Sequence, residues 1–211
     1  MADRRPLASR QNPLAGRAAR WLAERGIRPN RISQGSIVFA ALGAAAFALS
    51  AAGGAGPAAA LLVIAALACQ FRLLCNLLDG MVAIEGGLSE PDGPYWNEAP
   101  DRIADFLFLT GAGIAAGVPW LGLAAGAMAI LTAYIRELGR AEGLDSDFSG
   151  PMAKPQRMAA LTIGALLGAV EALAFGSSIA LTLALAVIAL GAAWTAAARS
   201  KRLIDTMNTG A

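Results

Sequence analysis

The sequence predicts an all-α integral membrane protein, a bundle of six transmembrane helices preceded by an amphipathic helix at the membrane surface. Three observations predict this. More than half of the 211 residues are apolar, only 15% are charged, and apolar runs recur at a length of about 20 residues, enough to cross a bilayer. The chain also contains 24 glycines, which allow membrane helices to approach one another closely.

The six expected spans occupy residues 36–52, 57–84, 99–118, 119–138, 158–175 and 178–198. Short connectors without Lys or Arg join spans one and two, three and four, and five and six, whereas basic residues gather in the other connecting regions and tails. Basic segments remain on the cytoplasmic side, so we expect both termini in the cytoplasm. We expect the membrane to be the inner membrane of a bacterium. Four Trp residues fall at expected span ends, where lipid headgroups lie: Trp21, Trp96, Trp120 and Trp194.

The region before the first span is strongly basic. Within it, an apolar stripe at helical spacing is formed by Leu14, Ala18, Trp21 and Leu22, and the arginines at 17, 20 and 25 lie outside the stripe. This pattern is typical of a helix lying on an anionic leaflet, although a solvated basic tail fits it nearly as well. We therefore divide the chain into a basic tail with an interfacial helix at 1–33, a membrane domain at 34–200 and a cytoplasmic tail at 201–211.

Polar residues interrupt two adjacent spans at the same expected end. Their spacing of three or four places each set on one helix face, and antiparallel spans bring the two faces together. We expect Asp79 at the level of Asn97 and Asp101, and Asn76 deeper, near Asp105. Arg72, one turn from Asn76, is expected to neutralise Asp79 or Asp105, or to contact a substrate phosphate.

Ionisable residues inside a span cost about 2.5 to 3.5 kcal/mol each and usually face a partner or a water-filled cavity. The chain has no histidine, which excludes a catalytic histidine and a histidine-bound zinc. Clustered carboxylate and amide oxygens favour hard divalent cations, Mg²⁺ or Mn²⁺. We expect the metal ligands to come from Asn76, Asp79, Asn97, Asp101 and Asp105, with Asp79 as the first of them.

The same residues resemble a known signature. Asn76-x-x-Asp79-Gly80-x-x-Ala83-Ile84 is followed by eight residues and then by Gly93-x-x-x-Asn97-x-x-x-Asp101. This is similar to the CDP-alcohol phosphatidyltransferase family, whose signature is D-x-x-D-G-x-x-A-R, eight residues, then G-x-x-x-D-x-x-x-D. Two aspartates of the signature are Asn here, and its arginine is Ile84. The resemblance extends to the six spans and to segments 29–33, 134–136 and 150–157, and so to most of the chain.

The resemblance implies a phospholipid-biosynthesis enzyme that transfers a phosphatidyl group from a CDP-linked lipid to an alcohol and releases CMP. It implies that Asp101 is the general base and also a metal ligand. It further implies that the nucleotide contacts Gly80, Ala83 and Gly93. It also implies a homodimer. No nucleic-acid-binding module is recognisable in the sequence.

A basic group beside the fourth connector is suited to bind a phosphate on the acceptor: Arg136, Arg140, Lys154 and Arg157. We therefore expect a phosphorylated acceptor such as glycerol 3-phosphate or an inositol phosphate. A bias of positive charge toward the cytoplasm explains these residues equally well. Two other functions remain open for the chain: a catalytically silent member of the family, because two acids are replaced by Asn, and a small ion or metabolite transporter.

Overall fold

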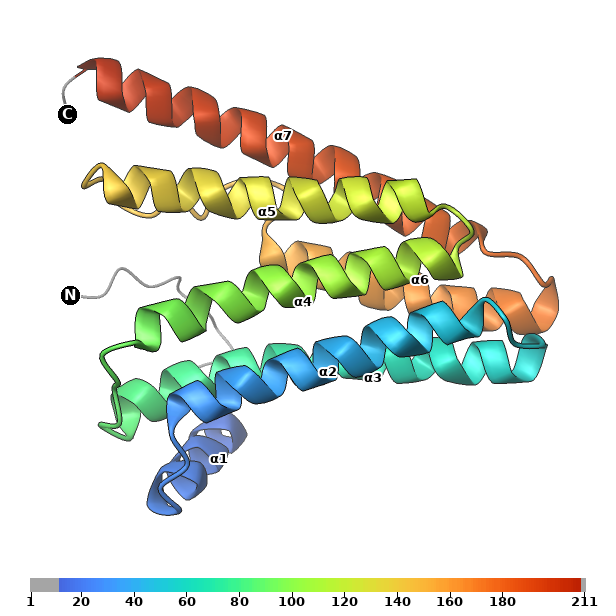
Figure 1. The fold of residues 1–211 in the computed structure, drawn as a ribbon, viewed down its shortest axis with the longest axis horizontal. Helices are drawn as coiled ribbons and strands as arrows, with labels where there is room; N and C mark the ends of the chain where they lie inside the picture. The colour runs from blue at the N-terminus through green and yellow to red at the C-terminus, as the bar shows by residue number, and fades with distance from the viewer. Residues whose placement is uncertain (1–11, 210–211) are drawn as a thin grey trace.

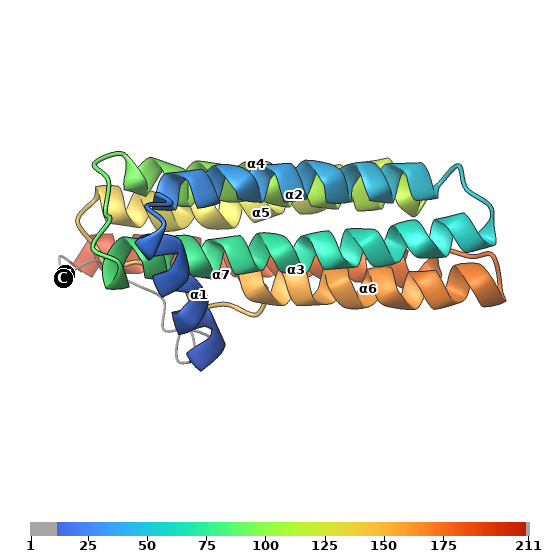
Figure 2. The same ribbon diagram turned by 90° about the horizontal axis from the view of Figure 1, so that it is seen from below.

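The computed structural model describes residues 12–209 and folds them into seven α-helices. Figure 1 shows them in chain order: α1 (Pro13–Glu24), α2 (Pro29–Ser50), α3 (Ala55–Glu85), α4 (Gly93–Ala115), α5 (Pro119–Ala141), α6 (Lys154–Ala174) and α7 (Ile179–Thr209). Helices α2 to α7 lie side by side in one elongated bundle, and α1 crosses one end of it at an angle (Figures 1 and 2). The starts of α2 and α4 and the ends of α3, α5 and α7 therefore share the end of the bundle near α1, and the start of α6 lies farther inside on the same side.

Five helices are long and apolar enough to cross a membrane: α2, α3, α5, α6 and α7. Helix α4 has 23 residues but is less apolar, because four charged residues lie within it: Glu98, Asp101, Arg102 and Asp105. The helices also extend past the expected spans. α2 begins at Pro29 rather than at 36, and α7 continues to Thr209 rather than ending at 198. The expected span limits were placed where the sequence changes from apolar to polar, but α2 and α7 stay helical beyond those points.

Small residues bring the helices into close contact. A Cβ atom on Gly113 of α4 would lie 2.8 Å from the Cα of Gly122 on α5, and one on Gly122 would collide with the carbonyl oxygen of Leu109. Gly43 of α2 leaves the space that the Phe108 ring fills. In this structure these glycines therefore serve packing within one chain, and the ring of Phe108 is fully buried as a result.

Helix α1 rests on the end of α3. Ala15 and Ala19 are buried against Met81 and Val82, directly after the polar segment of α3. Leu14 and Trp21 face outward and are 69% and 49% exposed, and the Arg25 guanidinium lies 4.0 Å from the centre of the Trp21 ring. The apolar arc of α1 is thus divided between α3 and the surroundings, and only its outer part remains available to a membrane surface.

The connector between α5 and α6 turns back along α7. Three positions one turn apart on α7 hold it. The Arg202 Nε donates to Asp147 Oδ2 at 2.9 Å, the Arg199 Nε donates to the carbonyl of Ser149 at 2.9 Å, and the Thr195 Oγ1 accepts from the Met152 amide at 3.1 Å. α6 therefore begins farther inside the bundle than α5 ends (Figure 1). This return places Lys154 and Arg157 beside α4.

Asp147 of this connector is held in its charged form. Burial raises the pKa of Asp147, but hydrogen bonds from the Ser149 hydroxyl and amide and from Arg202 outweigh it, so the pKa lies below its usual value. Arg199 also links the connector to α5, because its Nε donates to Ser149 of the connector and its Nη1 donates to the carbonyl of Thr132 on α5 at 2.8 Å. The connector is therefore fixed to two helices at neutral pH.

Candidate active site

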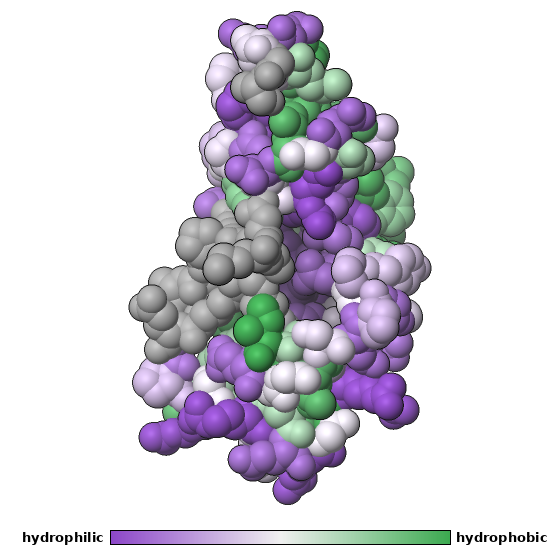
Figure 3. All heavy atoms as spheres, turned by 90° about the vertical axis from the view of Figure 1, so that its left-hand side faces the viewer, coloured by the Kyte–Doolittle hydropathy of each residue, from purple (hydrophilic) through white to green (hydrophobic). Residues whose placement is uncertain are grey.

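The polar groups gather at the end of the bundle near α1. Figure 3 looks onto this end and shows mostly hydrophilic side chains over the part that is not drawn in grey. Beneath this surface lie three buried carboxylates, Asp79, Asp101 and Asp105, and two buried arginines, Arg72 and Arg157. Charges this deep are stable only when they are paired or solvated, so the partners of each one define what the site can do.

Asp101 has partners on α3 and α6, besides Arg102 of its own helix α4, whose Nη2 lies 4.0 Å from its Oδ2. Its Oδ1 accepts hydrogen bonds from Arg72 Nη2 at 2.7 Å and from Asn76 Nδ2 at 2.8 Å, both on α3. Its Oδ2 is ion-paired with the ammonium group of Lys154, the first residue of α6. The carboxylate expected to act as the general base is therefore held on one side by buried groups and on the other by a lysine whose side chain is 23% exposed.

Asp105 lies one turn deeper on α4. Its Oδ2 is 2.6 Å from Arg157 Nη2, and its Oδ1 is 3.7 Å from Arg72 Nη2. Arg157 also donates to the carbonyl of Met152 at 3.0 Å and to Thr132 Oγ1 at 3.3 Å. Both side chains of this pair are almost completely buried. Arg157 therefore serves to neutralise Asp105 inside the bundle and does not face an open binding site.

Asp79 has neutral hydrogen-bond donors. Ser33 Oγ of α2 donates to its Oδ2 at 2.6 Å, and the Gly80 amide donates to its Oδ1 at 2.6 Å. No ion pair joins Asp79 to a basic side chain within residues 12–209. It is close enough to Lys154 and Asp101 to interact with both electrostatically. Asp79 is thus the acid of this site that a cation can approach without displacing an arginine or lysine.

The register of α3 and α4 differs from the expected one by about a turn. Asn76 lies level with Asp101 rather than with Asp105, and Arg72 lies between Asp101 and Asp105. The expectation assumed that α3 and α4 pack directly against each other. In the structure α2 packs on both, and α3 and α4 meet mainly through long side chains.

Other expected site residues lie farther out. Asn97 is exposed and donates to Glu98 Oε1 at 3.3 Å. Gly93 begins α4, and a Cβ atom there would meet nothing within 4 Å. Ala83 is half-buried, and its carbonyl accepts a hydrogen bond from Ser89 Oγ at 2.9 Å. Gly80 adjoins Asp79 and is half-buried. The structure therefore gathers Asn76, Asp79, Asp101 and Asp105 and leaves Asn97 outside.

The expected phosphate-binding group is divided. A small cavity of about 30 Å³ has five basic residues in its lining: Arg102, Arg136, Lys154, Arg157 and Arg199. Arg140 does not line it and instead pairs with Glu137 at 2.8 Å. Arg136 pairs with Glu98 and with Glu137. Sequence reasoning missed Arg102 and Arg199, although Arg102 directly follows Asp101 and that position could have indicated it.

The donor atoms present fit a hard divalent cation in part. Among the described residues no three acidic, histidine or cysteine side chains form a group able to hold an ion by themselves. Two oxygens of expected ligands are nevertheless buried without a hydrogen-bond donor in this part of the chain, namely Asn76 Oδ1 and Asp105 Oδ1. Buried oxygens without a donor are energetically costly, and a cation would satisfy them.

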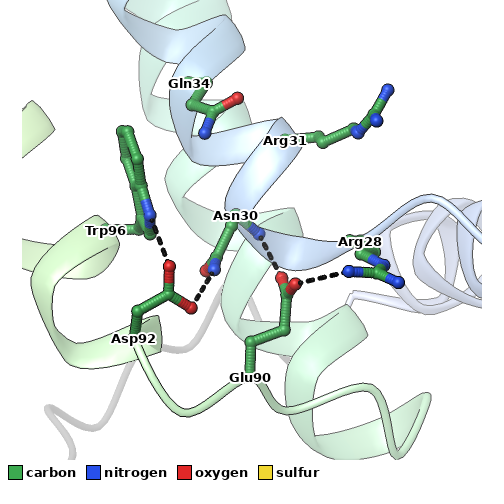
Figure 4. Close-up of a pocket in the computed structure, with 7 residues that line it drawn as sticks. All are labelled: Arg28, Asn30, Arg31, Gln34, Glu90, Asp92 and Trp96. Carbon is green, nitrogen blue, oxygen red and sulfur yellow. Dashed lines mark hydrogen bonds and ion pairs between the residues drawn. The ribbon is translucent and has the colours of Figure 1, made fainter.

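A larger surface cavity, of about 500 Å³, lies at the start of α2 (Figure 4). There Glu90 accepts from the Asn30 amide at 3.3 Å and pairs with Arg28 at 3.4 Å, and Asp92 accepts from Asn30 Nδ2 at 2.7 Å and Trp96 Nε1 at 2.9 Å. Glu90 thereby satisfies an amide in the first turn of α2, because the side chain of the N-cap residue, Arg28, makes no capping hydrogen bond to the helix. These bonds hold α2 where Ser33 reaches Asp79.

Comparison with solved structures identifies the fold. The chain is similar to the phosphatidylinositol phosphate synthase of Mycobacterium tuberculosis in complex with manganese and citrate (TM-score 0.74, 22% identity, covering 90% of this chain and 88% of that one). It matches the same enzyme with CDP-DAG bound (TM-score 0.74, 21% identity, 91% and 94% covered) and its apo form (TM-score 0.70, 21% identity, 87% and 93% covered).

Comparison with models of protein families and with curated proteins gives no match to the sequence. The structural similarity extends over nearly the whole of both chains. The chain therefore has the fold of a CDP-alcohol phosphatidyltransferase.

Proposed function

We propose that this protein transfers a phosphatidyl group from a CDP-linked lipid to an alcohol acceptor and releases CMP, as part of phospholipid biosynthesis. One observation supports this above the others. Asn76 and Asp79 of α3 and Asp101 and Asp105 of α4 converge at one end of a bundle that shares its fold with an enzyme whose structure contains CDP-DAG.

A divalent cation, Mg²⁺ or Mn²⁺, completes this site in our proposal. Support comes from the buried Asn76 Oδ1, which lacks a donor and lies one turn from Asp79 on α3, and from the manganese in the structure of the similar enzyme. Bound metal would neutralise charge on the diphosphate of the donor and on the departing CMP. Of the five expected ligands, Asn76, Asp79, Asp101 and Asp105 lie together in the structure and Asn97 lies outside them. Asp79 and Asn76 would contribute first, and the nucleotide would lie against Gly80, Ala83 and Gly93.

In the proposed step, the acceptor hydroxyl oxygen attacks the lipid-linked phosphorus, the bond from that phosphorus to CMP breaks, and the hydroxyl proton passes to a base. We assign the base to Asp101 Oδ2. Lys154 covers this oxygen in the structure, while Arg72 and Asn76 hold Oδ1 from inside the bundle. Because Lys154 is the partially exposed partner, its side chain can move to uncover Oδ2, and the carboxylate stays oriented by the other two.

The acceptor in this proposal has its own phosphate, glycerol 3-phosphate being the smallest example. The cavity lined by Arg102, Arg136, Lys154, Arg157 and Arg199 supports this, because positive charge gathers beside Asp101. Arg136 is a suitable contact, since its acidic partners, Glu98 and Glu137, are 26% and 35% exposed and can move away from it. Arg157 is already ion-paired with Asp105 inside the fold and would contribute mainly by its charge.

We further propose that α4 is the sixth transmembrane helix and that both termini lie in the cytoplasm of a bacterium. Helix α4 has 23 residues and packs on α2 and α5 within the bundle, so its charged residues face other helices and not lipid. Helix α1 would place Leu14 and Trp21 in the inner leaflet. Labelling of an introduced Ser146→Cys by an impermeant reagent from outside intact cells would contradict this topology.

The substrate test uses the purified chain in lipid nanodiscs with CDP-DAG and Mg²⁺ or Mn²⁺. Glycerol 3-phosphate, an inositol phosphate, glycerol, serine and inositol are supplied separately, and the lipid product is identified by mass. We expect product with a phosphorylated alcohol. No product with any acceptor would favour a catalytically silent protein, and ion or metabolite uptake by sealed proteoliposomes would favour a transporter. Cross-linking in the same membranes tests the proposed homodimer.

A further inference from the structure

Arg72 lies between two acids of the site. It is fully buried on α3, and a single atom, Nη2, is 2.7 Å from Asp101 Oδ1 and 3.7 Å from Asp105 Oδ1. Its Nε and Nη1 have no hydrogen-bond partner among the described residues. A guanidinium group stays protonated in proteins, so this arginine is a permanent positive charge at the centre of the site.

The Asp101–Asp105 side of the site already has more positive than negative charge. Lys154 is ion-paired with Asp101 and Arg157 with Asp105, so three cations surround two carboxylates once Arg72 is included. Arg102, which pairs mainly with Glu98, also lies 4.0 Å from Asp101 Oδ2. A divalent ion bound to both acids would meet these like charges. Displacing Arg72 would leave a buried arginine without compensation, which is strongly unfavourable. This side of the site is therefore poorly suited to bind a metal ion.

The Asp79 side of the site, in contrast, has no basic side chain paired with its carboxylate among the described residues. Asp79 has only neutral donors, Ser33 Oγ and the Gly80 amide, at 2.6 Å each. Asn76, three residues earlier on the same helix face, has its Oδ1 buried and without a donor. A carboxylate, an amide oxygen and a hydroxyl that can rotate are the ligand types that Mg²⁺ and Mn²⁺ prefer.

We infer that the site binds one divalent cation, at Asp79 and Asn76, and that Arg72 is a fixed internal cation that occupies the Asp101–Asp105 side where a second ion would otherwise bind. This inference rests on the proposed function. It also specifies the number of metal ions as one, whereas some phosphoryl-transfer sites use two metal ions to hold the attacking and leaving oxygens. Arg72 is here a positioning residue: it acts through Asp101, whose Oδ1 it holds.

The test counts bound Mn²⁺ by electron paramagnetic resonance, in nanodiscs without substrate. We expect one ion per chain in the wild type and at least about tenfold weaker binding in Asp79→Asn. Arg72→Gln, which removes the charge and keeps hydrogen-bonding groups, is expected to admit a second ion, whereas Arg72→Lys, which restores a cation, is expected to bind one. Tryptophan fluorescence melting identifies any variant that does not fold.

Two ions per wild-type chain would overturn the inference and leave the proposed transfer reaction intact. One ion in a folded Arg72→Gln variant would also overturn it, because the arginine would then not exclude a second ion. If Arg72→Gln does not fold, the wild-type count and the Asp79→Asn variant still decide the question. No Mn²⁺ binding by the wild type would contradict both this inference and the metal dependence in the proposed function.

Discussion

Arg157 and Asp105 form an ion pair inside the bundle, with 2.6 Å between Nη2 and Oδ2 and neither side chain more than 3% exposed. Removing one partner leaves the other charge buried and unpaired, which costs about 3 to 5 kcal/mol. We therefore expect Arg157→Met and Asp105→Asn each to lower the melting temperature strongly. The double variant should recover much of the loss, and melting of the detergent-purified protein measures it. Additive losses would contradict this assignment.

Arg136 offers a cleaner test of acceptor binding than Arg157 does. Arg136 lines the basic cavity and Arg140 does not, yet both pair with Glu137 on the same helix. We expect Arg136→Gln to raise the KM for a phosphorylated acceptor about tenfold or more and to leave the KM for CDP-DAG nearly unchanged. Arg140→Gln is the matched control, since loss of an exposed ion pair has little effect. Equal effects of the two substitutions would refute the assignment.

Gly150 allows the connector to lie on α7. Its φ is +122°, and a Cβ atom there would collide with Thr195 Cγ2. We expect Gly150→Ala to destabilise the protein by about 3 kcal/mol, from backbone strain and the clash together. Gly143→Ala is the control: its φ is +81° and a Cβ atom would meet nothing within 4 Å, so strain alone, about 1 kcal/mol, applies.

The clash component of the Gly150 effect can be isolated. Thr195→Ser removes Cγ2 and keeps the Oγ1 that accepts from the Met152 amide. Combined with Gly150→Ala it should return part of the lost stability, and thermal melting of the double variant would show this. No recovery would mean that strain at residue 150 accounts for the whole loss.

Acid should loosen the same connector. The pKa of Asp147 is lower in the fold than its usual value, so the stabilisation by this group is complete above the unfolded pKa, about 4, and is lost as the pH falls through the folded value. We expect limited proteolysis within 142–153 to accelerate below about pH 4. Asp147→Asn should show fast cleavage already at neutral pH. A pH-independent cleavage rate in the wild type would contradict the proposed anchor.

The all-helical architecture with long apolar helices followed from the sequence, because apolar length is a local property that tertiary packing seldom changes. The count of six spans stays a prediction, since five of the helices are long and apolar enough to cross a membrane. The partners of each acid could not be predicted from the sequence. Ser33 on Asp79, Lys154 on Asp101 and Arg157 on Asp105 lie 46, 53 and 52 residues apart in sequence. They depend on α2 packing between the two polar helices and on the α5–α6 connector turning back, neither of which has a periodic signal.

The grouping of four basic residues as one phosphate site was too simple for the same reason. Arg140 lies outside the cavity, and Arg102 and Arg199 line it. Arg199 comes from the last helix and donates to the carbonyl of Thr132 on α5 at 2.8 Å. A contact between two helices so distant in sequence cannot be inferred from charge patterning along the chain.

The most direct test of the proposed chemistry is the rate of CMP release from CDP-DAG by wild-type protein and by Asp101→Asn, with glycerol 3-phosphate and Mn²⁺ present. Asn keeps the size of Asp101 and an oxygen for Arg72 but cannot accept the acceptor proton. We expect acceptor-dependent CMP release by the wild type and a loss of about 10²- to 10⁴-fold in the folded variant. CMP release at the wild-type rate in Asp101→Asn, or none by the wild type with any acceptor, would contradict the proposal.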